Sequence, residues 1–258
     1  MDIFIKVIVC FFAGLGAGLG TGFAGMSAAA VIMPMLVTFL DMNAYQAVGI
    51  ALASDVLASA VSAYTYKKNG NLDVRNGLIM MAAVLTFTLV GSFVSSLVPN
   101  TTMGNFSVIM TMLMGVKFIV KPVMTTKEAM LGVSKKKRAI QSVICGSLVG
   151  FICGFVGAGG GIMMLLVLTT VLGYELKTAV GTSVFIMAFT ALTGSISHFV
   201  IGGIPDLLAL ALCVVFTLIW ARIGARFANK APAKVLNRAT GIILVILGVV
   251  ILSVKLFA

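Results

Sequence analysis

Long apolar segments separated by short polar stretches run along the whole of this 258-residue chain. Hydrophobic residues make up 60% of the sequence and charged residues only 10%, whereas about a quarter of a soluble domain is charged. Apolar segments of roughly 17–25 residues are long enough to cross a bilayer as helices. The pattern predicts an all-α polytopic membrane protein with about eight to ten transmembrane helices. The apolar segments lie at 3–21, 25–40, 47–66, 76–98, 104–120, 139–155, 158–172, 179–199, 207–228 and 236–256.

A glycine pattern occurs twice, 132 residues apart. The stretches GLGAGLGTGFAG at 14–25 and GSLVGFICGFVG at 146–157 share Gly-x3-Gly-x3-Gly-Phe-x-Gly. The same offset aligns Ala47-Val48-Gly49 with Ala179-Val180-Gly181. Self-similarity at a fixed offset indicates internal duplication. The sequence therefore predicts two five-helix repeats, at 1–120 and 139–258, joined by a basic linker at 121–138.

Basic residues gather in three of the polar stretches. Of the 18 lysines and arginines, 14 lie at 67–75, 121–138 and 222–238, which is the bias of cytoplasmic loops rather than of a nucleic-acid surface. Five crossings per repeat is an odd number, so the second repeat should be inverted. The repeat mates of the basic loops, at 200–206 and 98–102, carry no basic residue. Inverted repeats, here with both termini outside, are a common plan of secondary transporters.

The second segment of each repeat is short and is preceded by glycine. Residues 26–40 and 159–172 number 15 and 14, at the lower edge of spanning length. A helix that begins inside the membrane has unpaired N–H groups and a partial positive charge, which favour an anion. Such segments at matching places in inverted repeats indicate a transporter's substrate site. We expect substrate-binding residues at Gly157, Gly159, Gly160 and Gly161, and at Gly25 and Ser27 in the first repeat.

Other glycines and a few polar residues have competing interpretations. The glycines spaced four apart, at 14, 18, 22, 146, 150 and 154, are expected to let helices pack closely. Thr182 and Ser183 fall in the first turn of the eighth segment, where hydroxyls cap a helix or bind an anion. Asp55 lies within the third segment, and an acid at membrane depth is costly and usually functional. Proton coupling is one role for Asp55, and a hydroxyl partner on a neighbouring helix is the alternative.

The sequence contains no recognisable catalytic constellation. His198 is the one histidine, so no metal-ligand cluster and no nucleophile–base pair can be assembled around it. The four cysteines, Cys10, Cys145, Cys153 and Cys213, lie in apolar segments and are expected to act as packing residues. We therefore expect no enzymatic activity, metal or cofactor, and we expect the lipid bilayer and a small anion as partners.

The paired motifs resemble the sulfite exporter TauE/SafE family. They are GAGGG at 157–161, AVGTS at 179–183 and HFVIGG at 198–203, with departing first-repeat copies GMSAA at 25–29 and AVGIA at 47–51. The resemblance covers nearly the whole chain. It implies a bacterial inner-membrane transporter of small, often sulfur-containing anions, such as sulfite and sulfonates.

Two other functional classes stay open at this point: a passive anion channel, and a membrane assembly subunit without transport. Asp55 favours a coupled carrier over a channel, because an acid within the membrane can carry a proton. Two glycine-broken segments favour a binding site over a scaffold.

Overall fold

The computed structural model describes residues 3–95, 112–113, 116–117, 119–132, 134–156, 160–203 and 205–257. All the regular elements within these residues are helices, so the all-α prediction is confirmed. The helices are α1 (Ile3–Ala24), α2 (Ala29–Leu40), α3 (Ala44–Lys68), α4 (Val74–Ser95), α6 (Lys127–Leu131), α7 (Lys135–Val156), α8 (Gly160–Thr170), α9 (Leu176–Gly202), α10 (Leu207–Lys230) and α11 (Ala233–Phe257).

Several helices have the length and composition of membrane spans, which makes this a multi-pass membrane protein. Among the described residues, the candidate spans are Ile3–Ala24, Gln46–Lys68, Leu176–Val200, Leu207–Lys230 and Ala233–Val250. The apolar helices α2 and α8 are much shorter, with 12 and 11 residues. The predicted short second segment of each repeat is therefore confirmed. Most of the predicted segment at 104–120 lies outside the described residues.

Some helix boundaries differ from the sequence prediction. α9 begins at Leu176, three residues before the predicted start at 179, directly after a turn in which Gly173 has a φ of 65°. α7 begins at Lys135, so the basic residues at the end of the linker form its first turn. Lysine and arginine have high helix propensity, which explains this extension. The linker also contains the short helix α6, which the pattern did not predict.

The glycines spaced four apart lie where two helix pairs pack, α1 against α10 and α4 against α7. A methyl group on Gly18 would stand 2.8 Å from the Ala221 nitrogen, and one on Gly150 would stand 2.8 Å from the Val84 Cα atom. Only glycine permits so close an approach of two backbones. The packing prediction is confirmed for glycines 14, 18, 22, 146 and 150, and the surroundings of Gly154 lie outside the described part.

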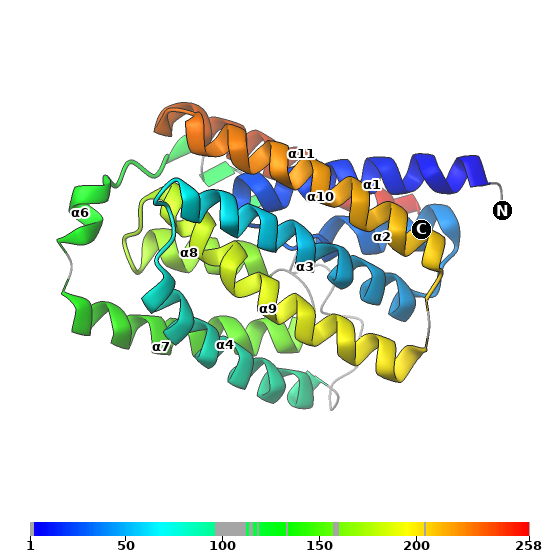
Figure 1. Ribbon diagram of the computed structural model, residues 1–258, viewed down its shortest axis with the longest axis horizontal. Helices are drawn as coiled ribbons and strands as arrows, with labels where there is room; N and C mark the ends of the chain where they lie inside the picture. The colour runs from blue at the N-terminus through cyan, green and yellow to red at the C-terminus, as the bar shows by residue number, and fades with distance from the viewer. Residues whose placement is uncertain are drawn as a thin grey trace.

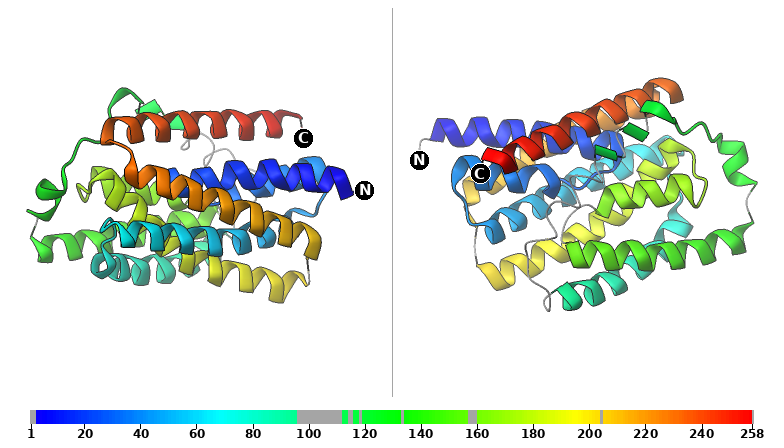
Figure 2. Two further views of the ribbon diagram at one scale, coloured as in Figure 1. Left: turned by 45° about the horizontal axis from the view of Figure 1, so that its top comes forward. Right: turned by 180° about the vertical axis from the view of Figure 1, so that it is seen from behind.

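The bundle has α3 and α9 packed together at its centre (Figure 1). The pair α1–α10, with α11 beside it, lies on one side of this centre, and the pair α4–α7 lies on the other (Figures 1 and 2). The short helices α2 and α8 each pack against a central helix, α2 on α3 and α8 on α9. Two long central helices thus hold the two short helices inside the protein.

The two ends of the bundle differ in charge. α6 and the basic segments lie at one end, which we call the basic end, and both termini lie at the other (Figures 1 and 2). The basic end includes the α3–α4 connection, the start of α7 and the α10–α11 connection. α2 runs from the interior toward the end with the termini, whereas α8 runs from the interior toward the basic end (Figure 1). The two short helices therefore point in opposite directions.

Candidate functional site

The starts of the two short helices meet inside the protein. A methyl group added to Gly161, in the first turn of α8, would overlap the carbonyl oxygen of Gly25 and stand 3.0 Å from the Ser27 nitrogen. Gly25 and Ser27 belong to the turn between α1 and α2. Two segments more than 130 residues apart thus touch through their backbones. We call this contact the α2–α8 junction.

Gly25 gives the first of these turns its shape. Its φ of 61° lies in the left-handed region that favours glycine, and its N–H donates to the Thr21 carbonyl at 3.0 Å, which ends α1. A methyl group at Gly25 would overlap the hydroxyl of Ser183 on α9. The Ser183 hydroxyl is buried and donates to the Val180 carbonyl at 2.9 Å. The α2–α8 junction therefore includes Ser183, which lies against Gly25.

Asp55 is a residue of α3 that lies beside the start of α2. Its carboxylate is fully buried and accepts hydrogen bonds from the Ser27 and Ser59 hydroxyls, each at 2.8 Å. Ser27 also accepts from the Ala29 N–H at 3.3 Å. A negative group is stabilised at the N-terminal end of a helix, where backbone N–H groups are unpaired. Asp55 is therefore buried, and its hydroxyl partners come from the turn between α1 and α2 (Ser27) and from its own helix α3 (Ser59), not from a neighbouring helix.

The equivalent place in the second repeat carries no charge. Adding the repeat offset to Asp55 gives Met187, whose sulfur faces Gly161 at the start of α8. Among the described residues, a carboxylate therefore faces the first turn of α2 and a thioether faces that of α8. A carboxylate repels a second anion, whereas a thioether does not. The electrostatics favour α8 over α2 for an external anion.

Thr182 points away from this junction. Because α9 begins at Leu176, Thr182 and Ser183 lie in its second turn, so the expectation that they occupy the first turn and cap it is wrong. The Thr182 hydroxyl accepts from the Asp73 N–H at 3.2 Å, in the α3–α4 connection. A methyl group on Gly181 would likewise meet that connection at Asn71. The AVGTS motif thus contacts two different regions, and Ser183 alone of its two hydroxyl residues reaches Gly25.

Of the remaining predicted residues, the structure describes Gly160 and Gly161. Gly160 and Gly161 are the first two residues of α8, and Gly160 is half-buried. Gly157 and Gly159 lie outside the described residues. No group of three metal-ligating side chains occurs within the described part of the chain. Cys10, Cys145 and Cys213 are buried free thiols.

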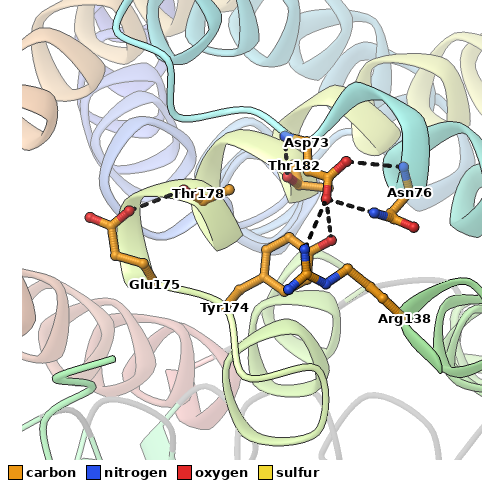
Figure 3. Close-up of polar contacts among 7 residues, drawn as sticks. All are labelled: Asp73, Asn76, Arg138, Tyr174, Glu175, Thr178 and Thr182. Carbon is orange, nitrogen blue, oxygen red and sulfur yellow. Dashed lines mark hydrogen bonds and ion pairs between the residues drawn. The ribbon is translucent and has the colours of Figure 1, made fainter. Parts of the chain in front are cut away.

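A polar cluster that the sequence pattern does not predict lies at the basic end (Figure 3). Asp73 precedes α4 and accepts from the Asn76 N–H at 3.1 Å and from the Tyr174 hydroxyl at 2.8 Å. The Arg138 guanidinium lies 3.8 Å from Asp73 and 5.1 Å from the centre of the Tyr174 ring. Burial raises the pKa of Tyr174 well above its usual range, and the Asp73 carboxylate raises it further. Tyr174 therefore stays a neutral hydrogen-bond donor.

A matching ion pair lies at the opposite end of the bundle, between Lys6 of α1 and Asp206. Asp206 caps α10 by accepting from the Ala209 N–H at 3.0 Å, as Asp73 caps α4. The hydrogen bond from Lys6 holds the pKa of Asp206 below its ordinary value. Lys6 and Arg138 are separated by the repeat offset of 132 residues, and the two acids by 133. Each pair joins a cap in one predicted repeat to the first helix of the other predicted repeat.

Comparisons with known proteins give one consistent result. A family model described as "Sulfite exporter TauE/SafE" matches residues 10–251. "Probable membrane transporter protein YdhB" of Bacillus subtilis (strain 168) is 24% identical over 91% of this chain and 96% of the relative. YunE of the same organism is 25% identical over 95% and 96%, and MJ0441 of Methanocaldococcus jannaschii is 25% identical over 96% and 94%. Both carry the same description as YdhB. No solved structure matches the chain.

Proposed function

The chain belongs to the sulfite exporter TauE/SafE family, and from that premise we propose that it is a secondary transporter of a small sulfur-containing oxyanion. The substrates that we propose are sulfite and sulfonates, the first of which agrees with the description of the family. The observation that carries the proposal is the α2–α8 junction, where two short helices of opposite direction begin against each other inside the protein. Unpaired N–H groups at a buried helix start form an anion site without any cationic side chain.

The substrate site comprises the start of α8 and the groups around it. The N–H groups of the glycine-rich stretch at 157–161 hold the oxyanion, and the Ser183 hydroxyl adds a further hydrogen bond. Gly25 and Ser27 form the opposite wall, since both lie against Gly161. Thr182 supports this site by holding α9 to the α3–α4 connection. Because Asp55 already occupies the start of α2, the anion binds in the second repeat.

Asp55 is the proton-coupling residue in this proposal. An ionised carboxylate near the junction disfavours an approaching anion, and protonation removes that repulsion. Proton and anion then move together. The Ser27 and Ser59 hydroxyls both donate to the ionised Asp55 carboxylate, and when Asp55 is protonated one of them can rotate to accept its single O–H while the other still donates.

The transport cycle rests on an inverted repeat, for which the helix packing gives support. The repeat offset relates α1 to α7, α4 to α10 and α3 to α9. The packed pair α1–α10 therefore has its counterpart in the packed pair α7–α4, and the central pair α3–α9 joins two equivalent helices. The ion pairs Lys6–Asp206 and Arg138–Asp73 correspond in the same way and lie at opposite ends. We assign them as two latches that open alternately, so that the α2–α8 junction faces one side of the membrane at a time.

Removing each latch should expose the junction from one side. In a chain without native cysteines, a cysteine at Ser183 reports access through its reaction with an impermeant maleimide. Lys6→Gln should speed labelling from the side of the termini, and Arg138→Gln from the basic end. The effect of Lys6→Gln should reach up to about fivefold, since a partly exposed ion pair contributes at most about 1 kcal/mol. The effect of Arg138→Gln should be larger, since Arg138 is buried. If both variants accelerate labelling from the same side, the alternating latches are wrong.

The proposed location is the bacterial cytoplasmic membrane, with the basic end in the cytoplasm and both termini outside. Asn69 and Gly203 are exposed residues at opposite ends of the bundle, which makes them suitable labelling sites. In intact cells, an impermeant reagent should react with a cysteine at Gly203 and should reach a cysteine at Asn69 only after lysis. Equal labelling of both in intact cells would contradict the inverted arrangement.

Transport by the purified chain in proteoliposomes tests the function. We expect saturable uptake of sulfite that a pH gradient drives above equilibrium and that sulfonates inhibit. Non-saturable flux that only dissipates a gradient would identify a passive anion channel. No flux of any of these anions would identify an assembly subunit.

A further inference from the structure

A cavity of about 670 Å3 opens at the basic end, apart from the α2–α8 junction. The α3–α4 connection, the first turn of α4, α6, the start of α7 and the first turn of α9 line it. Its charged lining consists of Arg75, Lys127, Lys136, Arg138 and Asp73. Four cations therefore face the cavity against one carboxylate, and a concave wall concentrates their field.

Arg138 is held in a fixed position at this cavity. Its side chain is only 7% exposed, lies over the Tyr174 ring and is 3.8 Å from Asp73 (Figure 3). A guanidinium has five N–H donors in a planar fork, so it can serve Asp73 and a second anion together. Because the side chain is already ordered, an anion that binds there loses little additional side-chain entropy.

Neutral groups donate hydrogen bonds that stabilise much of the negative charge on Asp73. Its carboxylate accepts from the Tyr174 hydroxyl, from the Asn76 N–H, and from the Asn76 side-chain amide at 2.7 Å. The Asp73 carboxylate therefore balances only part of the positive lining. Arg75 and Lys136 are exposed residues at the same cavity, where long flexible side chains can close over an anion.

We propose that this cavity is a second oxyanion site, which binds the phosphate, sulfate or sulfonate group of an organic anion. A bidentate guanidinium such as that of Arg138 matches the geometry of these groups. The volume lies within the range of pockets that enclose small organic molecules, and it exceeds the size of a bare oxyanion. A soluble organic anion and the headgroup of an anionic lipid share this chemistry. The lining residues of this site are separate from those of the α2–α8 junction, and two of them, Arg138 and Asp73, also form the latch at the basic end.

Binding of sodium pyrophosphate to the full chain in detergent tests the site by calorimetry, with sodium chloride at equal ionic strength as the reference. The double variant Arg75→Gln/Lys136→Gln removes two lining charges without touching Arg138. Lys67→Gln/Lys137→Gln is the matched control, because these exposed lysines lie at the same end and are not among the lining residues. We expect at least about tenfold weaker binding in the first variant, since hydrogen bonds to charged groups are the strong ones. The control should stay within about twofold.

A second arm identifies the source of the oxyanion group. Mass spectrometry of the chain in nanodiscs containing phosphatidylglycerol shows whether that lipid is retained. Retention by the wild type and loss in the Arg75→Gln/Lys136→Gln variant would assign the site to a lipid headgroup. Binding of pyrophosphate with no selective lipid retention would assign it to a soluble anion. Absence of both, or equal weakening in the two double variants, would overturn the proposal. Gly160→Ala should leave pyrophosphate binding intact, which separates this site from the junction.

Discussion

Replacing Gly160 with alanine is expected to abolish nearly all anion transport while the protein still inserts and folds. Gly160 is the first residue of α8 and is half-buried, so its N–H is among the unpaired groups at the helix start. An added methyl group stands between these N–H groups and an approaching oxyanion. Transport in proteoliposomes, with substrate affinity from thermal stabilisation in detergent, measures the effect.

Two further glycine variants show why Gly160 is the diagnostic position. A methyl group on Gly161 would overlap the Gly25 carbonyl, so Gly161→Ala disrupts the α2–α8 junction itself. Gly150→Ala brings a methyl group to 2.8 Å from the Val84 Cα atom and should destabilise the fold by about 1–3 kcal/mol without affecting the site directly. Unchanged affinity and rate in Gly160→Ala would place the anion elsewhere.

The Ser183 hydroxyl should matter less than the glycine turn. Ser183→Ala removes one hydrogen bond to the anion, and a hydrogen bond to a charged group contributes about 1.5–3 kcal/mol. Water can replace part of that contribution in an open site. We therefore expect weaker binding in Ser183→Ala, with transport retained.

Asp55→Asn should abolish accumulation driven by a pH gradient and preserve counterflow exchange of the anion. The amide matches the carboxylate in size and can keep a contact to Ser27 or Ser59, but it cannot carry a proton. Accumulation should therefore fall to the equilibrium distribution. Ser59→Ala is the matched control, since it removes one hydroxyl donor to Asp55 and leaves the titratable group in place.

The outcome of this comparison separates the two roles of Asp55. Loss of accumulation in Asp55→Asn with retention in Ser59→Ala supports proton coupling. Unchanged accumulation in Asp55→Asn would make Asp55 a structural residue that stabilises the start of α2.

The sequence predicted the features that glycine and periodicity determine. The short helices were expected at 26–40 and 159–172, and α2 and α8 lie at Ala29–Leu40 and Gly160–Thr170. Glycine interrupts the chain before both helices, so the sequence itself marks these starts. No capping residue indicates the start of α9, because Glu175 precedes the helix and its side chain does not cap it.

The pattern of hydrophobic and polar residues could not predict contacts between distant segments. The hydroxyls of Thr182 and Ser183 are adjacent in the sequence, yet one contacts Asp73 and the other lies against Gly25, because successive helical residues point about 100° apart. The Lys6–Asp206 pair could not be predicted from the charge bias, because Lys6 lies outside the three basic stretches. The repeat offset of 132 does not relate this pair to Arg138–Asp73 by itself, because Asp73 and Asp206 are 133 residues apart.

The position of a bound oxyanion tests the central claim most directly. Crystals of the full chain grown with selenite, a heavier analogue of sulfite, give an anomalous signal at the selenium absorption edge. The predicted result is a selenium peak about 4 Å from the backbone nitrogen atoms at the start of α8, beside Ser183, because a selenite oxygen lies within about 3 Å of these nitrogens and the selenium lies one bond length further away. A bound selenite found only away from that helix start would contradict the account.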